Sequence, residues 1–443
     1  MIEYFFFVKP YFLSELILLW NIKNFRTFIY LFKFIYVNLN KFNSSTVPQC
    51  ESYSSFDSKA SHLQKNIALR QSNANLQEIN LILTELDSVG VDESKKSKLM
   101  QRLKKEIWKV PNDTHPDIQE IGPEPRVIQK YNSPREINSM PKSFPEISKK
   151  LNLLRMEHLG NFTGHKSYYF LGALAEMEYA LLQYTLDRLK EHKFNLISVP
   201  DILPAQVIEG CGMETSGERT QVYKLAKNGL CLSGTSEMAL AGYFSNKVLT
   251  KEQLPIKLTA ISRCFRAETS GLQEEKGIYR VHQFSKAEMF TLCTPQQSDE
   301  MLEQFKEVEV SLYRDLELHF RLLDMPPNEL GAPAYRKYDI EAWMPGRNFW
   351  GEVSSCSNCT DYQAKRLNIR YKDGEDYHYV HTVNGTACAV PRMLIALIEA
   401  NQREEGTVTI PQVLQKYMRG KTEIRRVKQL PELKLTKSIQ SPI

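Results

Sequence analysis

The sequence lacks several features that would identify a class of protein directly. It has only eight cysteines in 443 residues, scattered along the chain, which argues against a disulfide framework and favours a reducing compartment. It contains no GxGxxG or GxxxxGKS/T loop, which argues against Rossmann-type and P-loop nucleotide binding. Cys356 and Cys359 have the CxxC spacing of zinc and redox sites, but no second pair or histidine cluster follows. We therefore expect no zinc and interpret both as packing cysteines in a strand.

The chain also lacks a long apolar run free of charges. Residues 1–50 are rich in Phe, Tyr, Leu and Ile, but charged residues interrupt them every few positions, whereas a transmembrane helix needs about 20 apolar residues in a row. Residues 21–45 are basic and contain no acidic residue, which is typical of mitochondrial targeting. We predict that residues 1–50 are a mitochondrial targeting segment, with the protein in the matrix and no stable membrane association. A membrane anchor, or a true start downstream of Met1, is the alternative.

Length and composition indicate a globular protein of more than one domain. A chain of 443 residues is too long for one compact core and predicts two to three domains. Its hydrophobic content of 42% and charged content of 25% are average for soluble proteins. The net charge of +5 is modest, so only its distribution along the chain bears on nucleic-acid binding.

Residues 51–110 form the first predicted domain, which is helical. Apolar residues recur at helical spacing from Leu76 to Leu86, and Gly90 ends this helix. A second helix is predicted from Asp92 to Lys109, with seven basic residues against one acidic residue between positions 95 and 109. The basic residues are Lys95, Lys96, Lys98, Arg102, Lys104, Lys105 and Lys109. This pattern fits either a solvated face or a surface that contacts phosphates.

The rest of the chain divides into a linker, a large domain and a tail. Residues 111–147 hold seven prolines without clear periodicity, which predicts a linker. Residues 148–420 alternate helical patterns near 170–192 and 296–323 with strand-like runs. The strand-like runs cover residues 257–266, 279–292, 347–356 and 378–384. This order predicts an α+β domain, an antiparallel sheet flanked by helices. Residues 421–443 form a basic tail.

Four segments of the large domain concentrate polar residues suited to chemistry. They are 232–237 (LSGTSE), 264–288 (with FRAE and GIYRVHQFSKAE), 349–355 (FWGEVSS) and 384–392 (NGTACAVPR). Arg266 and Glu268 are two apart, so in a strand they would share a face. Charged residues follow at 274–276, which makes this pair a candidate for gripping a triphosphate and its metal. Arg392 lies near the start of a helix, where the helix dipole also favours an anion.

These segments resemble the signature motifs of a known enzyme family. FRAE with GIYRVHQFSKAE is similar to motif 2 of the class II aminoacyl-tRNA synthetases. NGTACAVPRMLIALIEANQ is similar to their motif 3, and Pro200 matches the proline of motif 1. TSE at 235–237 and GEVSSCSNCTDYQAKR at 351–366 narrow the resemblance to seryl-tRNA synthetase. The likeness covers about residues 111–420, and Pro391, where most members have glycine, resembles the mitochondrial branch in animals.

The resemblance implies a six-stranded antiparallel sheet flanked by helices, preceded by an N-terminal helical arm that is short in this chain. It also implies a homodimer formed through motif 1, and ATP-dependent transfer of serine to tRNA(Ser). It assigns serine binding to Thr235, Ser236, Glu237, Glu288, Asn384 and Thr386. It assigns ATP binding to Arg266, Ala267, Glu268, Val281, Phe284, Glu352, Val353, Ser354, Ser355 and Arg392. Glu352 and Ser355 would hold Mg²⁺, and Arg266, Arg392 and Glu352 would carry the catalysis.

Within the resemblance, several residues have a specific role. Arg266 would bridge the serine carboxylate and the ATP α-phosphate, and Glu268 would read the adenine edge. Phe284 and Arg392 would enclose the adenine, while Thr386 would face the serine hydroxyl. These roles fit the chemistry, because the serine carboxylate is already a nucleophile at neutral pH and needs no general base. It needs alignment, and cations where charge builds on the phosphate.

The chain departs from the family in its N-terminal arm, whose helical part covers only about residues 60–109 and is shortened. A second basic cluster lies between Lys416 and Lys437, and we predict that it compensates for the short arm by contacting tRNA phosphates. One alternative is a catalytically inactive paralogue that acts as a mitochondrial binding partner, although such a protein should have lost ATP or serine ligands. Another is a threonine, proline, histidine or glycine enzyme, whose anticodon-binding domain would not fit in the 41 residues after Gln402.

Overall fold

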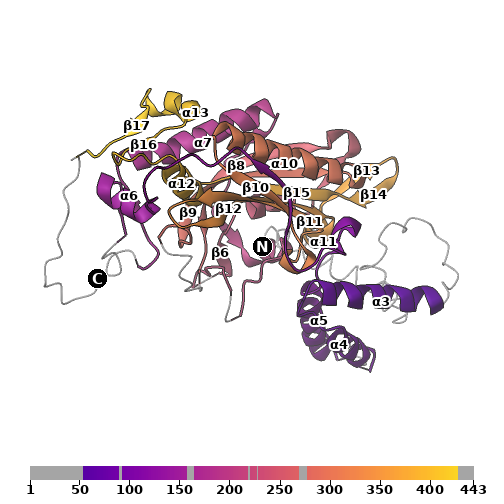
Figure 1. Ribbon diagram of the computed structural model, residues 1–443. Helices are drawn as coiled ribbons and strands as arrows, with labels where there is room; N and C mark the ends of the chain where they lie inside the picture. The colour runs from indigo at the N-terminus through magenta and orange to yellow at the C-terminus, as the bar shows by residue number, and fades with distance from the viewer. Residues whose placement is uncertain are drawn as a thin grey trace, which may run out of the picture. The chain divides into compact units, whose positions relative to one another are not determined.

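The structure is a computed structural model, and the chain divides into two compact units, Met1–Pro111 and Asn112–Ile443 (Figure 1). It describes residues 53–88, 92–156, 164–217, 220–226, 228–268 and 277–427. The predicted targeting segment at 1–50 lies outside the described residues. Within the described ranges, no helix is long and apolar enough to cross a bilayer.

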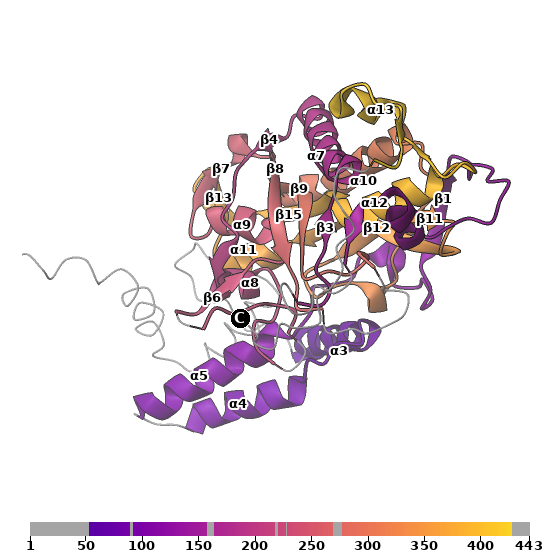
Figure 2. The same ribbon diagram turned by 90° about the vertical axis from the view of Figure 1, so that its left-hand side faces the viewer.

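The described part of the first unit is helical, as predicted. Its helices are α3 (Tyr53–Leu69), α4 (Leu76–Ser88) and α5 (Glu93–Trp108). Buried Leu86 and Leu103 belong to the core between α4 and α5, which lie side by side in Figure 2. Asp92 caps α5, because its carboxylate accepts a hydrogen bond from the backbone N–H of Lys95 at 3.0 Å. With 13 and 16 residues, α4 and α5 are only about 20 and 24 Å long.

The second unit is built on an eight-stranded sheet in the order β1-β10-β11-β12-β15-β9-β8-β4. In chain order these strands are β1 (Arg126–Tyr131), β4 (Asn195–Leu196), β8 (Ile256–Phe265), β9 (Gln283–Cys293), β10 (Phe320–Asp324), β11 (Arg336–Met344), β12 (Phe349–Thr360) and β15 (His381–Ala389). All neighbours are antiparallel except β4, which runs parallel to β8. The predicted α+β class is confirmed, but the implied number of six strands is wrong, because the short strands β1 and β4 extend both edges.

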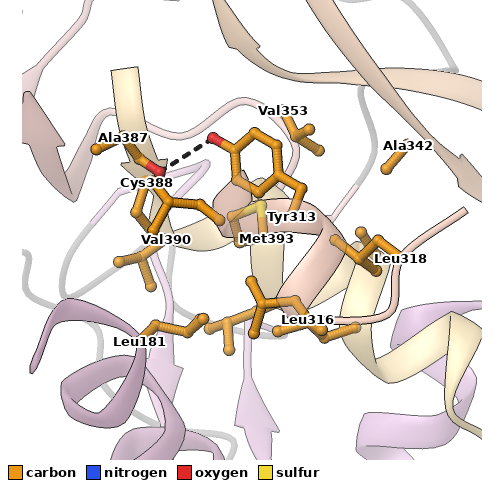
Figure 3. Close-up of a cluster of buried hydrophobic side chains, with 14 of the residues drawn as sticks. Leu181, Tyr313, Leu316, Leu318, Ala342, Val353, Ala387, Cys388, Val390 and Met393 are labelled. Carbon is orange, nitrogen blue, oxygen red and sulfur yellow. Dashed lines mark hydrogen bonds between the residues drawn. The ribbon is translucent and has the colours of Figure 1, made fainter. Parts of the chain in front are cut away.

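One face of this sheet is covered by long helices (Figure 1). They are α7 (Ala173–Glu191), α10 (Ser298–Asp315) and α12 (Val390–Ala400). Leu181, Tyr313 and Met393 bring the three helices into one buried core, part of which Figure 3 shows. Because alternate strand residues point to opposite faces, Met289 of β9 faces this core while its neighbour Glu288 faces the other side of the sheet.

The opposite face is covered by three short helices that pack at one end of the sheet. They are α8 (Ala205–Gly210), α9 (Ser236–Tyr243) and α11 (Tyr362–Leu367). Smaller strand pairs surround the sheet: β2 (Leu154–Arg155) with β3 (Tyr169–Phe170), β5 (Ile202–Pro204) with β6 (Leu230–Leu232), and β16 (Val408–Thr409) with β17 (Glu423–Ile424). A further small sheet joins β7 (Val248–Thr250), β13 (Arg370–Asp373) and β14 (Asp376–Tyr379), and α13 (Gln412–Gln415) precedes β17.

The proline-rich stretch 111–147 is not the simple linker that its composition predicts. It contains a 3₁₀ turn (Pro116–Ile118), the edge strand β1 and the start of α6 (Phe144–Leu151). Almost all side chains of β1 are exposed, so no apolar alternation marks this strand. Its main chain pairs with β10, and the Arg126 guanidinium contacts the Asp324 carboxylate of β10 at 2.6 Å. The side-chain amide of Asn112 donates to the carbonyls of Pro333 at 2.8 Å and Cys359 at 2.9 Å, which ties the start of this stretch to the domain.

The helix predicted near 296–323 is shorter than the sequence indicates. Helix α10 ends at Asp315, and β10 begins at Phe320. Between them Glu317 has a φ of 57°, a left-handed conformation that cannot continue an α-helix. The apolar residues after Asp315 fit a helix or a strand equally well, so periodicity alone does not locate this boundary.

Candidate active site

A cavity of about 260 Å³ lies on the side of the sheet opposite α7, α10 and α12. All of the predicted site residues line it except Ser236 and Ala267. The lining residues among them are Thr235, Glu237, Arg266, Glu268, Val281, Phe284, Glu288, Glu352, Val353, Ser354, Ser355, Asn384, Thr386 and Arg392. The fold therefore brings together the four segments that the sequence singles out.

The two predicted residues that do not line the cavity form hydrogen bonds with neighbouring segments. Ser236 is buried at the start of α9, and its Oγ lies 3.5 Å from the carbonyl oxygen of Ala260 in β8. The backbone N–H of Ala267 donates to the carbonyl of Gln221 at 2.9 Å. These contacts hold the neighbouring lining residues in place.

Arg266 and Glu268 do not share a strand face, which corrects the sequence prediction. Strand β8 ends at Phe265, so strand alternation does not extend to either residue. The Arg266 guanidinium lies over the Phe284 ring, 5.2 Å from its centroid. Glu268 has a φ of 39°, and its carboxylate lies 3.4 Å from the Arg280 guanidinium. Both residues still line the cavity, but each has its own partner.

One of the lining residues is a buried carboxylate. Glu288 of β9 is 2% exposed and forms an ion pair with Lys286, which is 5% exposed and lies on the same strand face. Burial raises the pKa of Glu288 to about 7; Lys286 opposes this shift, and the nearby carboxylate of Glu237 adds to it. Near neutral pH the group is therefore poised between its neutral and charged forms.

A second carboxylate, the half-buried Glu237, is held by two amide donors. Its Oε1 accepts hydrogen bonds from Gln363 Nε2 and from Asn384 Nδ2, both at 2.6 Å. Gln363 is in turn fixed by Thr382, whose hydroxyl donates to Gln363 Oε1 at 2.8 Å. Burial raises the pKa of Glu237, while the two amides and Lys286 act in the opposite direction. The Asn384 amide thus orients a carboxylate.

Thr386 of β15 lies directly opposite Glu288 in the strand register. Its hydroxyl is 3.5 Å from Glu288 Oε2 and 3.5 Å from Lys286 Nζ. A carboxylate, an ammonium group and a hydroxyl therefore meet at one point of the wall. Such a cluster suits a small ligand that carries an amine and a hydroxyl of its own.

A β-bulge in β12 aligns Glu352 and Ser355. Glu352 pairs with Glu341 of β11, and Ser355 pairs with Asp339. Glu352 and Ser355 are three positions apart in β12, but their partners are only two positions apart in β11. Val353 lies within the bulge and takes up the extra residue. Because paired residues share a face, Glu352 and Ser355 both face the cavity, which regular alternation would not allow.

Arg392, in the first turn of α12, fixes Glu352. Its Nη1 lies 3.3 Å from Glu352 Oε2 and donates to the Glu352 carbonyl oxygen at 3.0 Å, and its guanidinium lies 4.5 Å from the centroid of the Tyr279 ring. Desolvation works to raise the pKa of Glu352, but Arg392, Lys337 and Arg266 together hold it below its usual value. This carboxylate is therefore ionised at neutral pH, in contrast to Glu288.

The sequence prediction omits Lys286, Tyr279 and Arg280, which also line the cavity. Strand alternation could have found Lys286, because it lies two positions before Glu288. Tyr279 is the ring that contacts Arg392 in this structure, whereas the resemblance pairs Arg392 with Phe284 around the adenine. No sequence signal distinguishes these aromatic partners.

The CxxC pair lies in the strand β12, as predicted, and both cysteines are buried. Burial, together with nearby Glu309, raises the pKa of the Cys356 thiol well above its usual value. The sulfur of Cys359 accepts a weak hydrogen bond from the Asn384 amide at 3.6 Å. Over the part of the chain that the structure describes, no three His, Cys, Asp or Glu residues group as metal ligands.

The fold and the site define the core of a class II aminoacyl-tRNA synthetase. The family model of the tRNA synthetase class II core domain (G, H, P, S and T) matches residues 222–401. The mitochondrial serine–tRNA ligase of Mus musculus is 43% identical over 330 residues, which are 73% of this chain and 64% of the mouse protein. The serine–tRNA ligase of Treponema denticola is 40% identical over 338 residues, which are 75% of this chain and 80% of that protein.

A solved structure agrees with these relatives. The crystal structure of seryl-tRNA synthetase from Pyrococcus horikoshii complexed with ATP has a TM-score of 0.72 and 31% identity, covering 85% of this chain and 95% of that one. The chain belongs to the serine–tRNA ligase family. Its match spans less than two thirds of the mouse and bovine mitochondrial proteins, 64% of each.

Proposed function

We propose that this protein activates serine with ATP to form seryl-adenylate and then transfers the seryl group to tRNA(Ser). One observation carries the proposal: a single cavity has two chemically different ends. One end holds the half-buried Glu237 and the buried Glu288 beside Thr386, and the other holds Arg266 and Arg392. The first set suits an ammonium group and a hydroxyl, and the second suits a phosphate chain.

At the first end, the serine ammonium would pair with Glu288, and Thr386 would bond the serine hydroxyl. A buried carboxylate whose pKa is raised by burial gains most from a new cation, because that cation restores the charged form. Alanine would leave the hydroxyl partners unpaired, and an unpaired buried polar group is costly. Rejection of threonine would depend on the tightness of the wall around the side chain.

At the second end, the serine carboxylate would attack the α-phosphorus of ATP, and pyrophosphate would leave. Arg266 would bridge the two reactants, and Arg392 would balance the charge of the outer phosphates. In the second step a ribose hydroxyl at the 3′ end of the tRNA would attack the carbonyl carbon of seryl-adenylate, and AMP would leave. The complete ligand set argues against the inactive paralogue.

The residues predicted to hold Mg²⁺ fit that role. Mg²⁺ in nucleotide sites takes oxygen ligands from one or two carboxylates and from the substrate phosphates. Glu352 and Ser355 face the cavity together because of the bulge in β12, and the pKa of Glu352 is held low by nearby cations. When bound, Mg²⁺ would neutralise charge on the phosphates.

The proposal extends to assembly, partner and location. A homodimer would cover apolar side chains around the motif 1 segment, where Tyr179 is 74% exposed, Leu196 60% and Ile202 49%. The basic helix α5 would contact tRNA phosphates. The mouse and bovine relatives are named mitochondrial, which supports mitochondrial targeting through residues 1–50. A fluorescent protein fused after residue 50 should then enter mitochondria, and staining of any other compartment would argue against it.

Serine-dependent exchange of pyrophosphate into ATP tests the proposed activity. The full chain should catalyse exchange with serine and not with threonine or alanine. Arg266→Ala should abolish exchange, because charge on the α-phosphate loses the cation proposed to bridge the reactants. Arg403→Ala, on an arginine that is 54% exposed and outside the cavity, should not. A wild-type protein that binds tRNA without any exchange would instead support the inactive binding partner.

A further inference from the structure

Strand β15 loses its regular partners at the point where it lines the cavity. Its pairing with β12 reaches only as far as Gly385, opposite Cys356. On its other side, the register with β9 shifts between Thr386 and Cys388, so Ala387 is the extra residue of a bulge. Carbonyl groups that leave a sheet ladder in a buried place need other partners. Here those carbonyls belong to Thr386 and Ala387.

Helix α10 supplies one of these partners from the far side of the sheet. The hydroxyl of Tyr313 lies 3.0 Å from the carbonyl oxygen of Ala387 (Figure 3) and 3.2 Å from that of Thr386. The Ser354 hydroxyl of β12 donates to the same Thr386 carbonyl at 2.6 Å. Tyr313 is 1% exposed and is not among the residues that line the cavity. Its one donor hydrogen therefore serves the carbonyls of the bulge.

The contacts of the Thr386 hydroxyl depend on the exact position of β15. The Thr386 hydroxyl is 3.5 Å from both Glu288 Oε2 and Lys286 Nζ, at the outer limit of hydrogen bonding. A shift of a few tenths of an ångström in β15 would therefore decide whether the Thr386 hydroxyl points at the carboxylate or at a ligand.

We infer that Tyr313 is a positioning residue for the serine pocket: its hydroxyl holds the bulge of β15 so that Thr386 meets the substrate hydroxyl. This inference rests on the proposed function. Tyr313 acts through Thr386 and does not touch the substrate. Loss of its hydroxyl releases the bulge, and the recognition of the serine side chain weakens while the ATP end is unaffected.

Tyr313→Phe tests this inference, because it keeps the buried ring and removes only the hydroxyl. Tyr184→Phe is a matched control: Tyr184 of α7 is 3% exposed, and its hydroxyl lies 3.1 Å from the Leu312 carbonyl oxygen and 3.3 Å from Asp315 Oδ2. Both partners belong to α10, the helix of Tyr313, and neither belongs to β15. Both variants lose one buried tyrosine hydrogen bond. Pyrophosphate exchange by the full chain gives KM for serine and for ATP, and alanine as a competitive inhibitor gives Ki.

We expect Tyr313→Phe to raise the serine KM by about tenfold, the effect of removing one buried hydrogen bond, with the ATP KM and the alanine Ki within about twofold of wild type. Tyr184→Phe should change none of them. KM and Ki do not depend on the folded fraction, so a modest loss of stability cannot mask the result. Equal changes for serine and alanine, or for serine and ATP, would show a merely structural role. Absence of serine-dependent exchange in the wild type would overturn the proposed function itself.

Discussion

Glu237 and Glu288 are two carboxylates that line one cavity, and the charge of Glu237 raises the pKa of Glu288. Burial raises the pKa of Glu288 most, and the ammonium group of Lys286 offsets only part of this rise. An empty pocket thus holds a carboxylate near its titration midpoint. A ligand ammonium adds the missing positive charge, so amino-acid binding and ionisation of Glu288 are linked.

This linkage predicts that the KM for serine depends on pH and that the KM for ATP does not. The pKa of Glu288 is about 7, so below that pH the group is neutral and the ammonium loses its partner. The serine KM should therefore rise as pH falls below 7, approaching about tenfold per unit, while the ATP KM stays flat. Exchange kinetics between pH 6 and 8.5 would measure both.

Glu288→Gln provides the control for this prediction. It should raise the serine KM at every pH and abolish its pH dependence, because no titrating group remains, with the ATP KM unchanged. A serine KM that stays flat with pH in the wild type, or a dependence that survives in Glu288→Gln, would assign the titration to another group.

At the residue scale, the sequence predicts the site residues that lie in recognisable motifs. It does not predict the site residues whose role depends on which side chains pack beside them. Glu288 and Arg392 could be identified because each lies in a long motif. Lys286 was missed although strand alternation places it beside Glu288. Tyr279 could not be found, since which ring Arg392 contacts depends on packing. Tyr313 lies outside every motif, and only the register of β15 reveals its role.

At the scale of elements, α10 and β15 form a tightly fitted pair. Gly385 lies where β15 crosses α10, and a Cβ there would meet Glu309 Oε1 at 2.8 Å and Cys356 Cβ at 3.1 Å. Glu309 is fully buried, and burial raises its pKa well above the usual value, which favours its neutral form. The strand can approach the helix only because position 385 has no side chain.

Gly385→Ala should therefore disturb both stability and the serine pocket. Overpacking of a buried site costs about 1–3 kcal/mol, and the displaced strand carries Thr386 with it. We expect a lower denaturation midpoint and a raised serine KM. Gly331→Ala is the control, since its added Cβ would meet nothing closer than 3.8 Å. Unchanged stability of Gly385→Ala would mean that α10 and β15 are less rigid than this packing indicates.

Elements were predictable where the pattern was long and amphipathic. The apolar periodicity predicts the helices α4 and α5, and Asp92 marks the start of α5. Edge strands were not predictable, because β1 buries almost none of its side chains and shows no alternation. The end of α10 was missed because the residues after it are as apolar as the helix itself.

At the scale of the whole molecule, the basic helix α5 and the candidate active site belong to different units. The cavity is built entirely from residues after Asn112, whereas α5 carries most of the basic residues in the described part of the first unit. One of them, Arg102, pairs with Glu78 at 2.8 Å and Glu85 at 3.7 Å across to α4. Lys95, Lys98 and Lys105 are exposed on α5, so these three are better candidates than Arg102 for binding phosphates. The basic cluster predicted between Lys416 and Lys437 lies partly outside the described residues.

Replacing Lys95, Lys98 and Lys105 by glutamine should weaken tRNA binding without affecting serine activation. Every lysine–phosphate pair that the substitutions abolish should reduce the slope of log affinity against log salt by about 0.7–0.9, because fewer counterions are released on binding. Replacing the same three residues by arginine keeps the charge and should keep the wild-type slope. Filter binding of tRNA(Ser) at several salt concentrations measures this slope, and exchange without tRNA checks that the cavity is intact. If the glutamine variant keeps the wild-type slope and aminoacylation rate, the basic face of α5 is only a solvated surface, and tRNA must be recognised by other parts of the chain.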